Sequence, residues 1–239
     1  DRVLKPVRVA YGRKGLSGTR PGTLLKNQIP IRTDFWDVSE PGFMEADTVA
    51  HCGNSLAGDF AWSLTMTDIL TTWTESRATW GKGAEGVLAQ IKDIEAGLPF
   101  DMQGFDCDNG SEFLNWHLLR YFTDHPSLTS FTRSRAYRKN DNAHVEQKSW
   151  THVRQLFGYD RFEDPGLVPL MNELYANEWS LYQNHFIPSM KLLKKKRINS
   201  KYYKKYDSPR TPYDRVMALE HVSDEEKTRL QSVHKALNR

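Results

Sequence analysis

The alternation of hydrophobic and polar residues predicts three strands at the start of the folded part. These strands are expected over residues 43–50, 60–68 and 72–79. The alternation is clearest in the second segment, where Phe60, Trp62 and Leu64 share one parity and smaller or polar residues share the other. Glycine and asparagine residues between the first two segments favour a hairpin turn. The three strands should therefore form an antiparallel meander.

The rest of the pattern alternates helices with two further strands. Helical spacing of hydrophobic residues is found in four segments, 87–97, 111–122, 142–157 and 165–185, and strands are expected to end at Asp108 and to cover 128–132. Ser111 is the expected N-cap of the second helix, and a short amphipathic helix is expected near the end, over 223–237. This order predicts an α/β fold in which helices cover one mixed sheet.

In the helix expected over 165–185, a hydrophobic stripe identifies the buried face. It consists of Leu167, Leu170, Met171, Leu174 and Leu181. Because residues three and four apart share one side of an α-helix, we expect all five side chains to pack against the sheet.

Charge is distributed in three blocks. Residues 1–33 carry eight Lys and Arg against Asp1 alone, a net charge of +7, and residues 191–239 carry fourteen against six acidic residues, a net charge of +8. Since the whole chain has a net charge of +3, residues 34–190 carry −12. Basic arms suit polyanions, whereas an acidic centre repels DNA unless cations intervene. The alternative is an ordinary acidic domain between two solvated charged tails.

The charge blocks and the start of the strand pattern together suggest three parts: a basic N-terminal arm or linker (1–38), an acidic folded core (39–190) and a basic C-terminal extension suited to binding DNA (191–239). A chain of 239 residues with 38% hydrophobic residues can bury one substantial core. It contains two cysteines and no apolar run approaching the ~20 residues that cross a bilayer. We therefore expect a soluble, cytoplasmic protein with no membrane partner.

Three acidic residues occupy positions that suggest metal chemistry. Asp47 lies within the first strand, Asp108 closes the fourth just before a glycine turn, and Glu146 lies in the helix expected over 142–157. On a regular helix, Glu146 would share a face with hydrophobic residues, and a carboxylate there stays ionised only if a cation compensates it. Each residue also has a plainer interpretation: Asp47 as a surface acid, Asp108 as a turn former, and Glu146 as a partner of a nearby cation.

Three sequence blocks resemble the signature blocks of the DDE integrase core. They are EADTV at 45–49, DCDNGSEF at 106–113 and YRKNDNAHVEQK at 137–148. Asp108 and Glu146 are separated by 37 residues, close to the spacing typical of that family. The chain thus looks like an insertion-sequence transposase related to retroviral integrases. The resemblance implies an RNase H-like fold with a five-stranded sheet flanked by helices, and extended basic arms on either side.

The same resemblance implies a mechanism. Asp47, Asp108 and Glu146 would hold two Mg²⁺ or Mn²⁺ ions and catalyse cleavage of DNA ends and their transfer into target DNA. The implied partners are double-stranded DNA and further copies of the chain assembled on it, in a protein associated with the bacterial nucleoid. No nucleotide cofactor is expected, because no glycine-rich GKS/T phosphate loop is found.

Further basic and polar residues are candidates for DNA contact. They are Asn109, Lys148, Arg154, Lys194, Lys195, Lys196, Arg197, Lys201, Lys204 and Lys205. Three other functions remain open: an RNase H-type nuclease that hydrolyses without joining, a catalytically silent DNA-binding protein, and a protein-interaction module. The N-terminal helix-turn-helix module usual in such transposases is not recognised, so we expect the chain to be part of a longer protein.

Overall fold

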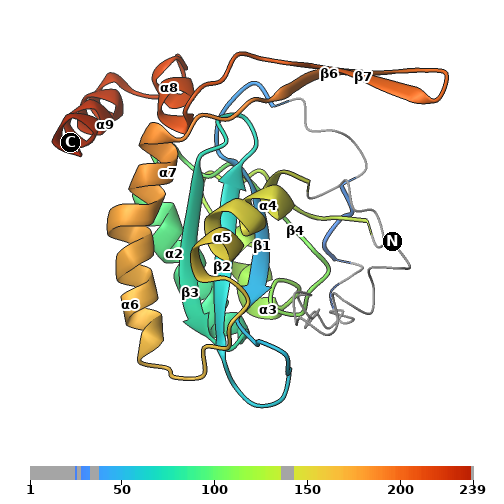
Figure 1. The fold of residues 1–239 in the computed structure, drawn as a ribbon, viewed down its shortest axis with the longest axis vertical. Coiled ribbons are helices and arrows are strands. Elements are labelled where there is room, and N and C mark those ends of the chain that lie inside the picture. Colours follow the sequence, from blue (N-terminus) through green and yellow to red (C-terminus); the bar gives the residue numbers. More distant parts are fainter. Residues whose placement is uncertain (1–24, 26–27, 33–37, 136–142, 238–239) are drawn as a thin grey trace.

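The computed structural model describes residues 25, 28–32, 38–135 and 143–237. Its centre is a five-stranded sheet in the order β3-β2-β1-β4-β5 (Figure 1). The strands are β1 (Phe43–Ala50), β2 (Ala61–Asp68), β3 (Thr74–Trp80), β4 (Gly104–Cys107) and β5 (Ser130–Arg133). The first three form the expected antiparallel meander, and β4 runs parallel to both β1 and β5. This topology confirms the RNase H-like mixed sheet.

One face of the sheet is covered by the two helices that connect β3 to β4 and β4 to β5. They are α2 (Ala84–Gly97) and α3 (Trp116–Thr123). Their hydrophobic stripes, including Ile91 and Leu118, pack on Met44, Leu64 and Phe105 from the central strands to form the main core. Because β1 and β4 are parallel neighbours, their carboxyl ends meet at one end of the sheet.

Helix α3 begins later than its sequence predicts. Asn115 rather than Ser111 caps it, because the Asn115 side chain accepts a hydrogen bond from the Leu118 N–H. Residues 111–114 form a separate turn in which the Phe113 and Leu114 N–H groups both donate to the Gly110 carbonyl. The N-cap assignment of Ser111 is therefore wrong, and the extra turn changes the position of Glu112.

The other face carries two helical segments that the sequence predicts as regular helices. The first comprises α4 (Ala143–Lys148), a π-helical turn (Ser149–Arg154) and α5 (Gln155–Phe157); the second comprises α6 (Leu167–Leu174), a π-helical turn (Tyr175–Trp179) and α7 (Ser180–Phe186). Each π-helical turn shifts the residues that follow it around the helix axis. In the second segment Met171 and Tyr175 are buried, whereas Leu170 is 61% exposed, so its expected burial is wrong.

Part of the predicted N-terminal arm belongs to the folded body. Leu25 and Ile29 are buried in the main core, and Ile31 forms a parallel bridge with Arg133 at the edge of β5. The remainder of the arm, including the glycine-rich stretch 12–22, lies outside the described residues. So do residues 136–142, which include the first residue of the helix expected over 142–157.

The C-terminal region is a β-ribbon followed by two helices. Strands β6 (Leu192–Ile198) and β7 (Lys201–Tyr206), which the sequence pattern did not predict, pair as an antiparallel ribbon that projects from the body (Figure 1). Helices α8 (Pro212–Met217) and α9 (Asp224–Ala236) return to the core through Val216, Val222 and Leu230. Among the described residues, no helix is both long and apolar enough to span a membrane.

Candidate catalytic site

Asp47 lies in the middle of β1, and its half-buried carboxylate is held by two donors. Oδ1 accepts a hydrogen bond from the Thr48 N–H at 2.8 Å, and Oδ2 accepts one from the Ser149 hydroxyl at 2.8 Å. Ser149 is the first residue of the π-helical turn after α4, so this bond ties the central strand to the helix above it. The carboxylate is therefore oriented before any ligand binds.

Asp108 directly follows β4, the parallel neighbour of β1. Its Oδ1 accepts a hydrogen bond from the Gly110 N–H at 2.7 Å, so the turn-forming role considered for Asp108 is present as well. Because Asp47 and Asp108 belong to the carboxyl-terminal parts of adjacent parallel strands, they lie at the same end of the sheet. Their charges interact, since Asp47 contributes to raising the pKa of Asp108.

Glu146 lies on α4, and its negative charge acts on Asp47 and raises the pKa of that group. The expected apolar surroundings of Glu146 are wrong. Glu146 is exposed and Trp150 is 49% exposed, whereas Val145 and Val153 are completely buried. The buried face of the helix is thus one position away from Glu146, which leaves its carboxylate at the surface beside Asp47.

A fourth carboxylate, which sequence reasoning missed, completes the group. Glu112 is 1% exposed, and its Oε1 accepts a hydrogen bond from the Thr48 hydroxyl at 3.1 Å. Its Oε2 is buried without a hydrogen-bond partner and lies 3.6 Å from the Lys82 ammonium. Gly110 makes this position possible, because a Cβ there would lie 2.6 Å from the Glu112 carboxyl carbon. The only signal in the sequence was the position of Glu112 inside the DNGSEF block.

Burial and mutual repulsion destabilise the charged forms of the two aspartates. Burial is the largest cause for both, and it raises the pKa of Asp47 to about 6 and that of Asp108 to about 7. Repulsion from Glu146 and Glu112 adds to the first shift, and repulsion from Glu112 and Asp47 adds to the second. Within the described part of the chain, no ion pair joins Asp47 or Asp108 to a Lys or Arg.

A neighbouring acidic pair shows the contrasting case. Glu45 and Asp106, two residues before Asp47 and Asp108, are 1% and 0% exposed. Arg32 joins both, with its Nη2 3.2 Å from Glu45 and its Nη1 3.4 Å from Asp106. Arg32 thus offsets part of the negative charge of this pair from within the protein, whereas none of the ion pairs found among the described residues joins Asp47 or Asp108 to an arginine.

The donor set of the candidate site suits a hard divalent cation, which prefers carboxylate oxygens and water. The buried Glu112 Oε2 without a hydrogen-bond partner and the raised pKa values of two aspartates fit a place where positive charge would be stabilising. Among the described residues, however, no group of three or more His, Cys, Asp or Glu side chains is arranged to hold a metal ion as it stands.

The three DNA-contact candidates near the acidic residues are used within the protein. The Asn109 amide donates to the Ser134 carbonyl and accepts from Arg133, and the Arg154 guanidinium donates to the Gly158 and Ala50 carbonyls. Lys148 is partly buried, which lowers its pKa to about 8. The remaining seven candidates, Lys194, Lys195, Lys196, Arg197, Lys201, Lys204 and Lys205, all lie on the β6–β7 ribbon.

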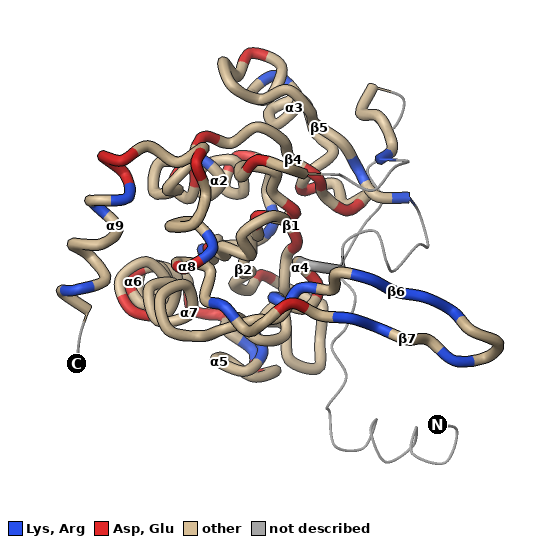
Figure 2. The backbone as a smooth tube through the Cα atoms, turned by 90° about the horizontal axis from the view of Figure 1, so that it is seen from above, with Lys and Arg blue, Asp and Glu red and all other residues tan. Residues whose placement is uncertain are grey.

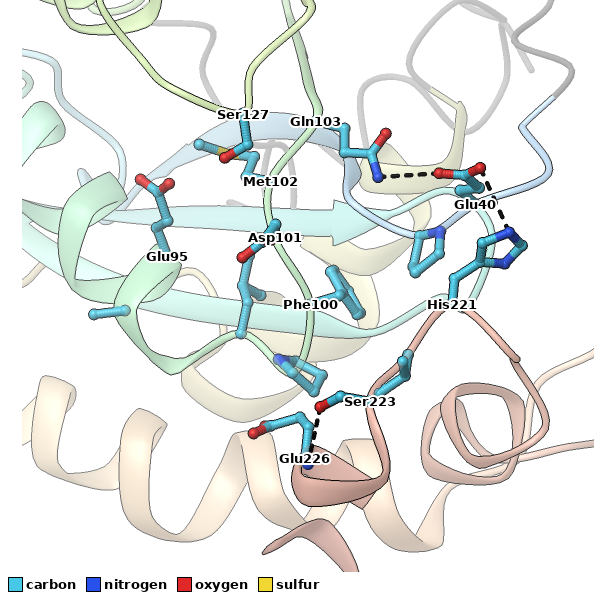
Figure 3. A pocket seen from close by; sticks show the side chains of 15 residues that line it. Glu40, Glu95, Phe100, Asp101, Met102, Gln103, Ser127, His221, Ser223 and Glu226 are labelled. Atoms are coloured by element: carbon cyan, nitrogen blue, oxygen red, sulfur yellow. Dashed lines mark hydrogen bonds and ion pairs between the residues drawn. The ribbon is translucent and has the colours of Figure 1, made fainter. Parts of the chain in front are cut away.

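A separate pocket of about 510 Å³ lies at the opposite end of the sheet (Figure 3). It is lined by segments that precede β1 and β4 and by the start of α9, and it contains Glu40, Asp101, His221 and Glu226. The side chains of Gln103 and His221 both contact the Glu40 carboxylate, at 3.3 and 3.4 Å. This pocket is therefore distinct from the candidate catalytic site.

No family model matches the chain. A protein of Sinorhizobium fredii, described as uncharacterized protein y4rM, is 37% identical over 218 residues, which are 90% of this chain. The chain spans 61% of the length of that relative.

Two solved structures have weaker similarity to the chain. They are the catalytic core domain of BIV integrase, with a TM-score of 0.43, and a simian T-cell lymphotropic virus intasome in complex with PP2A regulatory subunit B56 gamma, with a TM-score of 0.44. Each is 12% identical and covers 82% of this chain; the match covers 99% of the first chain and 74% of the second. At these scores the similarities do not bear on the chemistry of the site.

Proposed function

We propose that the chain is the catalytic part of a DNA transposase or integrase, a metal-dependent polynucleotidyl transferase. The observation that supports it is the grouping of Asp47, Asp108 and Glu146 from β1, the end of β4 and α4 at one end of an RNase H-like sheet. These are the three acidic residues of the DDE-like sequence blocks, and the fold brings them together although 98 residues of sequence separate the first from the last.

The residues have distinct roles in this proposal. Asp47, Asp108 and Glu146 would hold two Mg²⁺ or Mn²⁺ ions, which would supply activation of the nucleophile and stabilisation of the leaving oxygen. The Ser149 hydroxyl and the Gly110 N–H set the starting orientations of Asp47 and Asp108. Glu112 is a positioning residue, because its bond to the Thr48 hydroxyl and its ion pair with Lys82 connect the strand that carries Asp47 to the β3–α2 loop.

The proposed reaction is an in-line displacement at phosphorus. In end cleavage, a water oxygen forms a bond to phosphorus while the bond to the 3′ oxygen breaks, and the departing 3′ oxygen takes up a proton. In strand transfer, that 3′-hydroxyl attacks a phosphodiester of the target and releases another 3′ oxygen. The second step forms one phosphodiester bond for each one that it breaks, so it needs neither ATP nor a covalent enzyme intermediate.

Double-stranded DNA is the proposed partner, and the proposed active assembly contains at least two copies of the chain. An element has two ends and each chain has one group of catalytic acidic residues, so coordinated joining of both ends requires two sites. In the cell, we propose that the protein acts in the cytoplasm at the nucleoid, where its DNA substrate lies.

The decisive experiment separates joining from hydrolysis. The protein is incubated with Mn²⁺, a labelled DNA duplex with a recessed 3′ end, and a supercoiled target plasmid. Transfer of the label into the plasmid supports the proposal, and its loss in Asp108→Asn shows that this site is responsible. Cleavage without transfer would indicate an RNase H-type nuclease instead, and DNA binding with neither reaction would indicate a catalytically silent DNA-binding protein.

A further inference from the structure

The β6–β7 ribbon is basic on both of its faces. Directly paired residues of an antiparallel ribbon point to the same side, and successive pairs alternate. The register therefore places Lys195, Arg197, Tyr202 and Lys204 on one face and Lys194, Lys196, Lys201, Tyr203 and Lys205 on the other. Lys195 and Arg197 pack over the Tyr202 ring at 4.7 and 5.7 Å, which agrees with this assignment.

The ribbon places like charges opposite one another. Lys194 is paired with Lys205, and Lys195 with Lys204. Like charges in directly opposed positions destabilise a β-ladder, and residues 191–206 contain no acidic residue to offset them. Every position of both strands is exposed, so no packing against the protein body offsets this repulsion. The charge pattern thus opposes the stability of the ribbon and favours an anionic partner that reaches both faces.

The base of the ribbon is fixed to the folded body. Asp207 accepts a hydrogen bond from the Lys191 N–H at 2.5 Å and one from Arg215 on α8 at 2.7 Å. The Lys191 ammonium donates to the carbonyls of Ile69 and Leu70 in the β2–β3 turn, at 2.9 and 2.6 Å. These bonds hold the start and the end of the ribbon together. Figure 2 shows the ribbon extending from the body, with Lys and Arg along both strands.

We propose that this ribbon inserts into the major groove of double-stranded DNA and contacts the phosphates of both strands. The major groove is about 12 Å wide and admits a two-stranded β-ribbon. At ~3.3 Å per residue the longer strand spans roughly 20 Å, enough to follow the groove past several base pairs. Cations on both faces match a groove whose two walls are phosphate backbones. This site deepens the proposed function by assigning where duplex DNA is held outside the catalytic acidic residues.

Two other anionic partners fit the ribbon less well. The major groove of A-form RNA is too narrow for side chains to enter. A membrane-surface element needs one apolar face, whereas here both faces carry lysines. Single-stranded nucleic acid is bound by stacking on open aromatic rings, and Tyr202, Tyr203 and Tyr206 are exposed, so the relative affinity for single strands and duplex is an outcome of the test below.

The test measures duplex binding by fluorescence anisotropy in EDTA, so that it does not depend on metal or catalysis. Two triple variants each remove three charges from one face: Lys195→Gln, Arg197→Gln, Lys204→Gln, and Lys194→Gln, Lys196→Gln, Lys205→Gln. The matched control removes three charges from helices α2 and α9: Lys92→Gln, Lys227→Gln, Lys235→Gln. Each ribbon variant should weaken duplex binding at least tenfold. It should also reduce the steepness of the slope of log association constant against log salt concentration by about 2 to 3, since each phosphate contact contributes about 0.9 to that slope. The control should stay within about twofold.

Groove choice is tested with modified DNA. Duplex carrying glucosylated 5-hydroxymethylcytosine, which fills the major groove, should bind the wild-type chain at least tenfold more weakly and should hardly affect the ribbon variants. A minor-groove ligand such as distamycin should leave wild-type binding unchanged. Binding that depends on one face only, competition by distamycin, or equal affinity for single strands would overturn the proposal. Because all measurements exclude metal, these outcomes are independent of whether Asp108→Asn abolishes joining.

Discussion

The Lys82 ammonium lies 3.6 Å from Oε2 of Glu112, and it is the lysine that reaches the acidic end of the sheet from the β3–α2 loop. Its ammonium group also lies over the Trp62 ring, with Nζ 5.0 Å from the ring centroid, and its side chain is 21% exposed. Its charge also lowers the pKa of Asp108. Lys82 thus places a positive charge at the edge of the carboxylates, where a DNA phosphate would approach.

Replacing Lys82 should therefore impair the reaction. We expect Lys82→Met, which keeps most of the aliphatic length of the side chain, to lower the rate of strand transfer at least tenfold, equivalent to about 1.4 kcal/mol or more of transition-state stabilisation. Its free energy of unfolding in urea should also fall, by roughly 1–3 kcal/mol, because the buried Glu112 carboxylate loses its ion-pair partner, so the rates are compared under conditions where all the proteins are folded. Lys92→Met on α2, where the lysine lies over Tyr121, is the matched control and should leave the rate unchanged. Equal rates for both variants would assign Lys82 a structural role.

The three acidic residues should be required individually. Asp47→Asn, Asp108→Asn and Glu146→Gln should each reduce cleavage and joining at least a thousandfold and weaken Mn²⁺ binding measured by calorimetry, because each removes a negatively charged metal ligand. Duplex affinity in EDTA should remain within about threefold. Asp101→Asn, on an exposed residue at the other end of the sheet, is the control. A variant that joins DNA at the wild-type rate would remove its residue from the proposed triad.

The buried pair Glu45 and Asp106 should make the fold depend on Arg32. Removing one partner of a buried ion pair leaves an uncompensated charge and typically costs about 3–5 kcal/mol. Arg32→Met should accordingly lower the free energy of unfolding by about 3 kcal/mol or more in urea titration. The triple variant Arg32→Met, Glu45→Gln, Asp106→Asn, which also removes the charges, should recover part of that loss. An Arg32→Met protein as stable as the wild type would show that Arg32 does not stabilise this pair.

His51 should make the protein sensitive to mild acid. Burial is the main cause that lowers its pKa from 6.5 to about 3, and the ring is hydrogen-bonded to Ser63 and stacked on Phe162. The unfolded chain thus binds a proton more readily than the folded chain. Stability is fully present above pH 6.5 and is lost as the pH falls towards 3, by up to about 3 kcal/mol at pH 4.

The measurement for His51 is a series of urea titrations between pH 7 and pH 4. Compared with the wild type, His51→Gln should be less stable at pH 7, because it loses the stacked ring, but its stability should fall less on acidification. The control is His125→Gln, which removes a histidine from the α3–β5 loop. Its free energy of unfolding should keep the dependence on pH that is attributed to His51. Identical pH slopes for wild type and His51→Gln would contradict the prediction.

Two inactive proteins should restore joining when mixed, if ribbon and active site act in different copies. One is Asp108→Asn with an intact ribbon, and the other has an intact site and lacks residues 191–206. Recovery of two-ended joining after mixing would indicate that the ribbon holds DNA for the site of a neighbouring copy. Continued inactivity, where light scattering shows that mixed assemblies form on DNA, would indicate that each copy serves its own DNA end.

Local sequence determined much of the sheet. The strand over residues 43–50 has the predicted bounds, and β2 and β3 differ from their predicted limits by at most two residues, because alternation of hydrophobic residues directly encodes which side chains face the core. The sequence also predicted helix α9, which begins after its N-cap residue Ser223. It did not predict the β6–β7 ribbon, since lysines and tyrosines on two exposed faces leave no periodic pattern of hydrophobic residues.

Tertiary packing decided the surroundings of the acidic residues. The DDE-like blocks identified Asp47, Asp108 and Glu146, but a regular helical period wrongly placed Glu146 among apolar side chains. The observed helix buries Val145 and Ser149 instead, and it continues as a π-helical turn. Glu112 lies in the site because residues 111–114 form a turn and not the start of α3. The Asn115 cap and the close packing of Glu112 on Gly110 determine this difference. Sequence therefore determined which residues carry the proposed chemistry, and only long-range contacts decided which carboxylate is buried, which is exposed and which lysine lies beside them.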